Sequence, residues 1–338
     1  MRTGTVGRLF DAGPNNFNVL RLLAALAVIY GHAFPIVGSG GQDLYLALVG
    51  NKFIGGVAVD VFFVISGFLI AASLERSSPA RYAWSRALRI FPALIVALLL
   101  SVFVLGPVLT TSEAYWTDAQ TWRYLYNNAL MVRTEYFLPG VFDGHPDRAI
   151  NGSLWSLPVE FRLYVLFFML SILGLLKAER YMLLTIALWL LALAVMPRYP
   201  VFEQYGTWVN AAALFFAGAL VWTRRYEVPL SPWGVLAVIA IGVMTHGTPA
   251  FKTLYVVGLV YVVFVSALSI RLPRVESRDL SYGVYLYGWP AQQLAFHLVP
   301  GPHPYVNALL GATIALCIAW ASWEFVERPA LSFKSLVR

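Results

Sequence analysis

Apolar blocks of about 20 residues recur along the whole chain, and they limit its possible folds more than any other feature. Each block is long enough to cross the hydrocarbon core of a bilayer as a helix. Of the 338 residues, 59% are hydrophobic and only 12% are charged, whereas soluble domains carry roughly 25% charged residues. A soluble chain of this composition could not cover its own surface with polar groups. The sequence therefore predicts an all-α integral membrane protein with a single domain over residues 1–338.

The apolar blocks predict about ten transmembrane helices. The first block is followed by no evident signal-peptide cleavage site, so it is interpreted as a retained helix. Cys317 is the single cysteine, which excludes a disulfide within the chain. The fifth and sixth blocks are short, and either could be tilted or re-entrant. The predicted spans are residues 17–37, 53–74, 90–109, 155–176, 181–196, 208–223, 232–248, 252–270, 279–298 and 305–325.

Lysine and arginine residues are distributed unevenly between the loops that these spans leave. With the N-terminus inside, 16 of the 24 basic residues fall in cytoplasmic loops, six fall in outer loops, and Arg21 and Arg162 fall within spans. Cytoplasmic loops of membrane proteins carry such an excess, so the net charge of +7 does not indicate a nucleic-acid partner. The sequence therefore predicts that both termini are cytoplasmic and that the longest loop, residues 110–154, is extracytoplasmic.

Ionisable residues within the predicted spans are candidate functional residues, because charge inside a bilayer is costly. They are Arg21, His32, Asp60 and Glu160, with Arg162 close behind. Each also has a structural interpretation. Arg21 can reach the headgroups, His32 can be an interfacial histidine, Asp60 can pair locally, and Glu160 can be an ion-pair partner of either arginine. All four together are harder to explain by structure alone.

Spacing gives these residues a geometry. Arg21 and His32 are eleven residues apart, which is about 16 Å and three turns on one helix, so both face one side. Glu160 follows Trp155 by five residues, which predicts a position about 7 Å below the outer surface, level with His32. A carboxylate beside an imidazole can fix its tautomer and orientation. The pair would suit general acid–base chemistry on a hydroxyl group.

Several segments of the chain resemble the acyltransferase-3 family of membrane acyltransferases, and the resemblance covers essentially the whole length. Arg21 is followed by ten residues and His32, and Asp60 precedes an aromatic pair in GVAVDVFFVISGFLI. Gly288 stands where many members carry histidine, which leaves His32 as the main candidate base. A fused esterase-like domain, which some members have, is not expected. The resembling segments are residues 17–32, 56–70, 81–92, 151–161, 281–290 and 327–329.

The resemblance implies transfer of an acyl group, usually acetyl, from cytoplasmic acyl-coenzyme A (acyl-CoA) to a sugar hydroxyl outside the membrane. The acceptor would be a lipid-linked glycan or a polysaccharide, as in O-antigen or exopolysaccharide modification, and the location would be a bacterial inner membrane. The sequence does not indicate which glycan is modified or how many copies of the chain assemble. No metal is expected, because the histidines lack ligand spacing.

The resemblance and the spacing together suggest roles for the donor side of the site. His32 would be the general base or the acyl carrier, and Glu160 would orient His32 or contact the acceptor. The phosphates of acyl-CoA would be held by arginines, since arginine forms bidentate contacts. Arg21 would take the pyrophosphate. The other residues expected to bind the donor are Arg81, Arg86, Arg89 and Ser66.

The acceptor side is expected to contain an intramembrane carboxylate and several aromatic residues. Ser66 has an alternative role, because intramembrane serines usually bond to a backbone carbonyl one turn earlier or to a neighbouring helix. The arginines before the third span could equally serve only to set the topology. The residues expected to bind the acceptor are Asp60, Trp155, Tyr164 and Tyr285.

Two other functional classes fit parts of this pattern. A transporter or flippase for a lipid-linked sugar would explain ten helices and buried charges, but the chain shows no internal repeat with matching broken helices. A membrane polymerase or ligase of glycans would explain a large outer loop, but it would leave the pair Arg21 and His32 without a role. Binding of coenzyme A from the cytoplasmic side would separate the acyltransferase from both.

Overall fold

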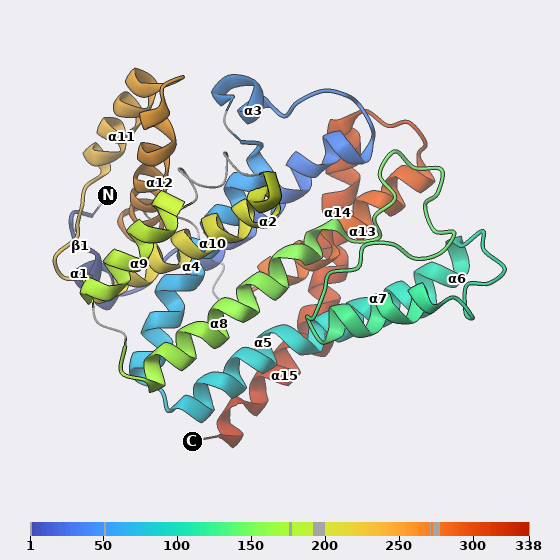
Figure 1. The fold of residues 1–338 in the computed structure, drawn as a ribbon, viewed down its shortest axis with the longest axis horizontal. Coiled ribbons are helices and arrows are strands. Elements are labelled where there is room, and N and C mark those ends of the chain that lie inside the picture. The colour runs from blue at the N-terminus through green and yellow to red at the C-terminus, as the bar shows by residue number, and fades with distance from the viewer. Residues whose placement is uncertain are drawn as a thin grey trace. The chain divides into compact units, whose positions relative to one another are not determined.

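The computed structural model describes residues 2–50, 52–175, 178–191, 200–270, 272 and 278–337, and most of them are helical. Figure 1 shows the elements in chain order. They are β1 (Gly4–Thr5), α1 (Val6–Asp11), α2 (Phe17–Ile36), α3 (Leu44–Val49), α4 (Ile54–Arg76), α5 (Pro79–Leu100), the π-helix η1 (Ser101–Leu105), α6 (Gly106–Leu109), α7 (Ala119–Ala129), the 3-10 helix η2 (Gly152–Trp155), α8 (Ser156–Ile172), α9 (Ala178–Leu190), α10 (Pro200–Thr223), β2 (Pro229–Leu230), α11 (Pro232–Thr245), α12 (Pro249–Phe264), the π-helix η5 (Val265–Ser269), α13 (Ser281–Leu298), α14 (Pro304–Ser322), the π-helix η6 (Trp323–Glu327), α15 (Arg328–Ser332) and the 3-10 helix η7 (Phe333–Leu336).

The predicted class, an all-α membrane protein, is confirmed. Shorter apolar helices and α13 occupy other predicted spans, while residues 192–196 of the fifth span lie outside the described residues. The count of ten and the cytoplasmic location of both termini remain predictions. Within the described residues, six helices are long and apolar enough to cross a membrane, and these are Phe17–Ile36, Ile54–Arg76, Pro79–Leu109, Gly152–Ile172, Gly206–Thr223 and Pro304–Leu336.

The third span begins eleven residues earlier than predicted. The sequence suggested a basic loop before residue 90, but α5 begins at Pro79 and carries Arg81, Arg86 and Arg89 on its first turns. Proline is well suited to the first turn of a helix, and the alanine, arginine and leucine residues that follow are strong helix formers. The three arginines hide this helical start from a hydropathy pattern. The helix therefore fixes the positions of the three arginines, whereas a flexible loop would not.

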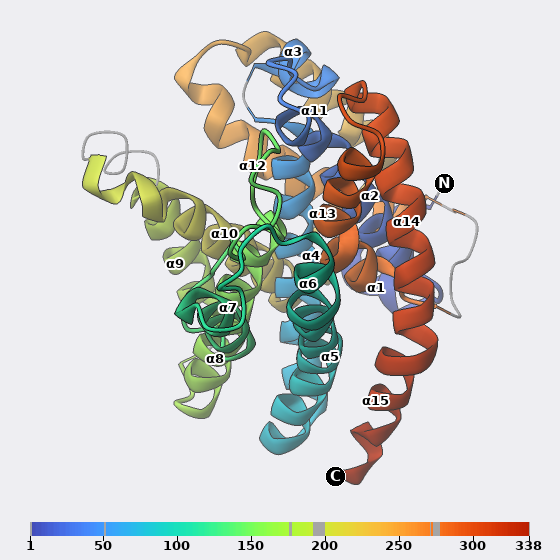
Figure 2. The same cartoon turned by 90° about the vertical axis from the view of Figure 1, so that its right-hand side faces the viewer.

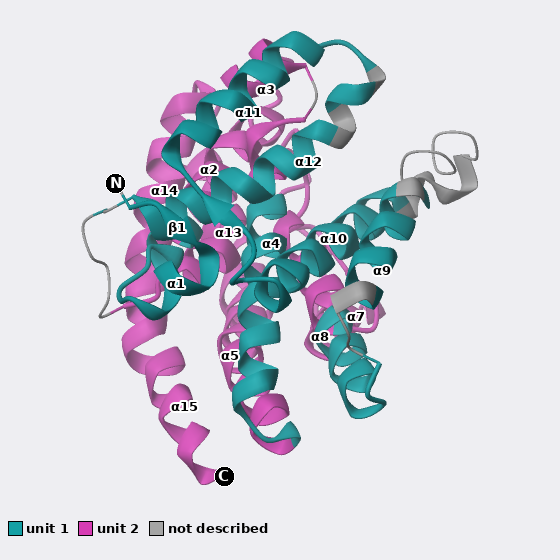
Figure 3. Ribbon diagram, turned by 90° about the vertical axis from the view of Figure 1, so that its left-hand side faces the viewer, with its two compact units in different colours: residues 1–21, 59–79, 162–275 teal, residues 22–58, 80–161, 276–338 magenta. Residues whose placement is uncertain are grey.

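The chain forms two compact units, each assembled from separate parts of the sequence (Figure 3). Unit 1 contains residues 1–21, 59–79 and 162–275, and unit 2 contains residues 22–58, 80–161 and 276–338. The boundaries fall within α2, α4 and α8, so these helices belong to both units. The predicted site residues are consequently divided between the units.

Aromatic packing forms the core of unit 1. The ring of Phe68 on α4 is fully buried, and its centroid lies 4.9 Å from that of Phe264 and 5.2 Å from that of Trp222. Nearby, α4 and α10 cross so closely that a Cβ atom on Gly67 would overlap the carbonyl oxygen of Phe215. Glycine at position 67 therefore allows the two helices to pack closely.

Buried amides join the helices of unit 2. Helices α13 and α14 run side by side (Figure 2), and Gln292 donates from Nε2 to the Asn307 side chain at 2.9 Å and to the Ile29 carbonyl on α2 at 2.9 Å. The Asn307 amide donates back to the Gln292 carbonyl at 3.0 Å. A Cβ atom on Gly288 would lie only 2.8 Å from Ile29 Cγ1. A larger residue at Gly288 would therefore require the Ile29 side chain on α2 to shift.

Candidate functional site

His32 lies on α2 between two aromatic rings of unit 2. Its ring centroid is 4.7 Å from that of Trp289 on α13 and 5.3 Å from that of Phe53. The Nδ1 atom is buried and makes no hydrogen bond of ordinary geometry with the described residues. The backbone of Val28, one turn earlier on α2, is the polar group that interacts with the ring. Packing therefore fixes the imidazole, and no side chain of the described residues forms a hydrogen bond with it.

The last part of the predicted outer loop descends along α13. Gln293 Nε2 donates to the carbonyl oxygens of Asp147 at 2.7 Å and Ala149 at 2.8 Å. His145 Nδ1 donates to Gln293 Oε1 at 2.8 Å, and Trp289 Nε1 donates to the Ala149 carbonyl at 3.0 Å. Two side chains of α13 thus satisfy backbone carbonyl groups of the loop that burial would otherwise leave without partners.

The same segment continues toward the beginning of α13. Asn151 Nδ2 donates to the Leu286 carbonyl at 2.8 Å. The Tyr285 hydroxyl donates to the Ser153 carbonyl at 3.1 Å and shares a 2.5 Å hydrogen bond with the Ser156 hydroxyl. Residues 145–156, named here the descending segment, therefore deliver the first residue of α8 to the second turn of α13. The outer loop of the prediction, residues 110–154, also contains the helix α7.

Glu160 does not lie beside His32. Its carboxylate acts electrostatically on the hydroxyl groups of Tyr82, Tyr282 and Tyr285, whereas the environment of His32 is set by burial and by the backbone of Val28. On α13, Tyr285 and Tyr282 precede Trp289 by four and seven residues, or about 6 and 10 Å. The predicted pairing of the two side chains is therefore not found among the described residues, although α8 begins at Ser156, one residue from the predicted start. Their common depth in a membrane remains a prediction.

Arg89 of α5 lies beside Tyr282, one of the tyrosines on which Glu160 acts. Arg89 Nη2 lies 2.7 Å from Asp279 Oδ2, Arg89 Nη1 lies 3.8 Å from Glu327 Oε2, and all three side chains are at least 85% buried. The Arg89 guanidinium also lies 5.6 Å from the centroid of the Tyr282 ring. Arg89 thus belongs to a buried ion-pair network. Glu327 reaches it from the π-helix η6, a distortion that often marks functional positions.

Arg86 and Arg81 are less enclosed than Arg89. Arg86 is half-buried and acts electrostatically on the Tyr82 hydroxyl, as Glu160 does. Arg81 is exposed on the first turn of α5. The structure therefore gathers Arg86, Arg89 and Glu160 around two tyrosines, an arrangement that the sequence did not predict. Their roles toward the donor and the acceptor remain predictions.

Asp60 lies in unit 1, where two neutral donors hold its carboxylate. Asp60 is 2% exposed. Asn210 Nδ2 on α10 donates to Oδ1 at 3.1 Å, and the Tyr255 hydroxyl on α12 donates to Oδ2 at 3.0 Å. Hydrogen bonds of this kind offset part of the cost of burying a charge. Asp60 therefore joins three helices of unit 1.

The remaining predicted residues take separate positions. Arg21 lies half-buried on α2 and Ser66 half-buried on α4, both in unit 1. Tyr164 on α8 is 7% exposed, with its ring centroid 6.2 Å from that of Phe215. Trp155 is half-buried at the end of η2 in unit 2. Tyr285 is also in unit 2, where its hydroxyl holds the descending segment.

Several neighbours of these residues escaped the sequence analysis. Asn210, Tyr255 and Gln293 are polar groups within apolar helices, a signal that marks candidates for interhelical hydrogen bonds. Asp279 and Glu327 lie at the edges of apolar blocks, and nothing in their local sequence identifies Arg89 as their partner. Partners separated by so much of the chain become visible only in the folded structure.

Comparison with known proteins gives the same family as the motifs. A family model described as an acyltransferase domain matches residues 15–324. An "O-acetyl transferase" of Shigella phage Sf6 is 30% identical, over 95% of this chain and 97% of that protein. "Nodulation protein 10" of Rhizobium leguminosarum bv. viciae is 27% identical, over 95% of this chain and 94% of that protein.

A longer relative is similar to this chain over part of its length. "Peptidoglycan O-acetyltransferase OatA" of Listeria monocytogenes serovar 1/2a is 25% identical, over 92% of this chain but 54% of that protein. No solved structure matches the chain. The family model covers most of the chain, including the Arg21–His32 pair, Asp60 and Glu160. The chain therefore belongs to the acyltransferase-3 family of membrane proteins and is an acyltransferase.

Proposed function

We propose that this protein transfers an acyl group, most simply acetyl, from cytoplasmic acyl-CoA to a hydroxyl group of an extracytoplasmic or lipid-linked polysaccharide. The family supports acyl transfer. The names of the relatives, an O-acetyl transferase and a peptidoglycan O-acetyltransferase, support a glycan hydroxyl as acceptor. The bacterial inner membrane is the location that fits such a reaction, since the donor is made in the cytoplasm and the acceptor is exported.

The state of His32 is the observation that best supports a chemical role for this residue. Its ring is fixed against Trp289 and Phe53, and its nitrogen atoms make no hydrogen bond with another side chain among the described residues. An imidazole that is held by packing keeps its lone pair for a substrate. Arg21, three turns earlier on α2, places a cation about 16 Å away along the axis. Donor phosphates near Arg21 and a thioester near His32 would fit this separation.

The direct reaction needs one base. His32 takes the proton from the sugar hydroxyl while the hydroxyl oxygen attacks the thioester carbonyl carbon. The carbon–oxygen bond forms, the carbon–sulfur bond breaks, and coenzyme A leaves as a thiolate that the imidazolium then protonates. In the alternative, His32 itself attacks the carbonyl carbon and carries the acyl group to the acceptor. Both routes release one coenzyme A for each ester formed.

The other polar residues supply binding functions in this proposal. Arg81 is exposed and Arg86 is half-buried on α5. Both guanidinium groups would contact the donor phosphates. Arg89 keeps their helix in place through Asp279 and Glu327. Glu160 lies with these arginines, so its proposed role is contact with a substrate and not orientation of His32.

Label transfer from acetyl-CoA tests the proposal. Purified protein in proteoliposomes receives acetyl-CoA carrying a labelled acetyl group, with or without a glycan fraction from bacterial membranes. We expect label to move into base-labile esters of the glycan with wild-type protein, and not with His32→Gln. His246→Gln is the matched control, because His246 is the exposed residue that follows α11 and has no proposed role in the reaction.

The outcomes separate the proposed routes. Label retained on the wild-type protein without acceptor, and absent from His32→Gln, would support the acyl-carrier route. Label in the glycan without labelled protein would support direct transfer. If the wild-type protein neither binds acetyl-CoA nor releases coenzyme A, the proposal fails and the translocation of a lipid-linked sugar becomes the better hypothesis.

A further inference from the structure

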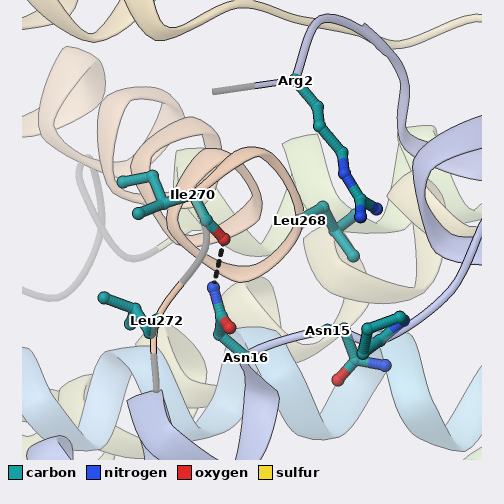
Figure 4. Close-up of a pocket in the computed structure, with 7 residues that line it drawn as sticks. Arg2, Asn15, Asn16, Leu268, Ile270 and Leu272 are labelled. Carbon is teal, nitrogen blue, oxygen red and sulfur yellow. Dashed lines mark hydrogen bonds between the residues drawn. The ribbon is translucent and has the colours of Figure 1, made fainter. Parts of the chain in front are cut away.

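A cavity of about 350 Å³ lies within unit 1, between the N-terminal segment and the end of the helix pair α12 and η5 (Figure 4). The cavity is at the lower end of the size range of ligand pockets, about 300–1,000 Å³. It has room for part of a cofactor and not for a complete one. Its lining combines one cation, two amides and several apolar side chains, namely Arg2, Pro14, Asn15, Asn16, Leu268, Ile270 and Leu272.

Hydrogen bonds fix one wall of the cavity. Asn16 Nδ2 donates to the carbonyl oxygens of Ser266 at 2.9 Å and Ile270 at 2.6 Å, and the backbone nitrogen of Asn16 donates to the Ala267 carbonyl at 2.8 Å. The backbone nitrogen of Arg2 donates to the Ser269 carbonyl at 2.9 Å. These bonds join the N-terminal segment to the end of η5 at several points. The cavity is therefore part of the folded unit.

The Arg2 guanidinium is the main polar group of the cavity, and its charge is available. Among the described residues it makes neither an ion pair nor a side-chain hydrogen bond. Arg225 of the same unit, by contrast, donates to both carboxylate oxygens of Glu75, at 3.3 and 2.9 Å. Asn15 accepts a hydrogen bond from the Phe17 nitrogen at 3.2 Å, and among the described residues its amide N–H groups donate to no other group. The lining residues that the structure describes offer hydrogen-bond donors and include no carboxylate.

We propose that this cavity binds a phosphate group at the nucleotide end of the acyl-CoA donor. The inference rests on the proposed function, which supplies the donor. A guanidinium forms bidentate, charge-assisted hydrogen bonds with phosphate, and the Asn15 amide adds a further donor. Leu268 and Ile270 offer an apolar surface for the flat base of the nucleotide. The predicted topology places Arg2 and Asn15 before the first span, on the cytoplasmic side where acyl-CoA is present.

Equilibrium binding of adenosine 3′,5′-bisphosphate, the phosphate-bearing end of coenzyme A, tests this site. The full chain is studied in nanodiscs, once with phosphatidylcholine alone and once with added phosphatidylglycerol. We expect Arg2→Gln to weaken binding of the bisphosphate roughly tenfold or more, since a charge-assisted contact is lost. Arg8→Gln is the matched control, because this substitution removes the same charge from an exposed position on α1. Asn15→Ala should weaken binding by a smaller factor.

Several outcomes would overturn the proposal. Equal affinity of wild-type protein and Arg2→Gln would exclude the cavity as the phosphate site. Equal losses in Arg2→Gln and Arg8→Gln would show only an effect of overall charge. If phosphatidylglycerol abolishes binding of the bisphosphate in the wild type, while Arg2→Gln no longer responds to this lipid, the cavity binds a lipid headgroup instead. Acetyl-CoA binding that is intact in Arg2→Gln would contradict this inference and leave the proposed function standing.

Discussion

His32 and His145 lie against the same helix but are used in different ways. Both rings pack on aromatic side chains of α13, with His32 4.7 Å from Trp289 and His145 4.7 Å from Phe296 between ring centroids. His145 donates from Nδ1 to Gln293 at 2.8 Å. His32 makes no such bond among the described residues. His145 is thus held by a side-chain hydrogen bond, whereas His32 is held in place without one among the described residues.

This difference helps to distinguish a structural histidine from a catalytic one in an apolar chain. A side-chain partner that also binds the backbone, as Gln293 binds the Asp147 and Ala149 carbonyls, indicates a structural role. A ring held only by packing keeps a nitrogen for chemistry. On this basis we expect loss of His32 to affect the reaction, and loss of the His145 contacts to affect the fold.

The largest effect is expected from replacement of the two histidines. His32→Ala should lower the rate of acyl transfer by roughly 100-fold to 10,000-fold, because a general base contributes about that much. His145→Ala should keep the rate within about tenfold of the wild type, since it breaks one neutral hydrogen bond. Initial rates at saturating acetyl-CoA give the answer. Similar rates for both variants would end the distinction between the two rings.

A smaller effect is expected when the descending segment loses its main support. Gln293→Ala removes three hydrogen bonds and leaves the Asp147 and Ala149 carbonyls without this donor, so we expect a destabilisation of about 2–3 kcal/mol. Thermal unfolding in detergent measures it. The control is Gln120→Ala, whose amide makes one exposed hydrogen bond to the Phe137 carbonyl. If Gln293→Ala has the melting temperature of the wild type, the hydrogen bonds of Gln293 are not needed to stabilise the descending segment.

Acidification should test His145 through its protonation. Partial burial lowers the pKa of His145, its bond to Gln293 raises it in part, and His297 lowers it further. Because the pKa in the folded state is depressed, the stabilising contribution is fully present above the unfolded-state pKa of about 6.5. It is lost as the pH falls through the folded-state pKa.

The comparison is between the wild type and His145→Gln from pH 7.5 down to pH 5. The wild type should lose more thermal stability over this range than the variant, which cannot titrate at this position. Taking the difference cancels the contribution of His32, which both proteins share. Parallel curves for the two proteins would contradict the assignment of this titration to His145.

The smallest effect is expected at Trp289, which contacts both the His32 ring and the descending segment. Trp289→Phe keeps an aromatic ring against His32 but removes the hydrogen bond to the Ala149 carbonyl, worth about 1 kcal/mol. We expect a slightly lower melting temperature and a transfer rate within a few-fold of the wild type. Trp233→Phe, at an exposed position on α11, is the control. A hundredfold loss of rate in Trp289→Phe alone would mean that the indole N–H itself serves the reaction.

The membrane fold could be predicted where ionisable residues are isolated within a long apolar block. Helices α2 and α4 begin and end close to the predicted positions, because Arg21, His32 and Asp60 are each surrounded by apolar residues. The start of α5 was missed since its first turns carry Arg81, Arg86 and Arg89. Local sequence reports how apolar a segment is, and it does not report that a charged residue such as Arg89 is buried in an ion-pair network on a helix.

The candidate site could be predicted in its membership and only partly in its arrangement. Intramembrane charge identified His32, Asp60 and Glu160, and each lies on a helix as expected. The neighbours of Glu160 were missed, because Tyr285 holds the start of α8 beside the first turns of α13, where Glu160 acts on tyrosines and not on His32. A hydrogen bond between residues more than 120 positions apart leaves no trace in the local pattern.

The descending segment also sets an order for the biosynthesis of the protein. Residues 145–156 emerge from the ribosome long before α13, whose Gln293, Trp289 and Tyr285 side chains satisfy their carbonyl groups. Until α13 is made, these carbonyl groups have to bond to water instead of to its side chains. Completion of the membrane domain is therefore a late event, in which one of the last helices to be made draws an earlier loop into place.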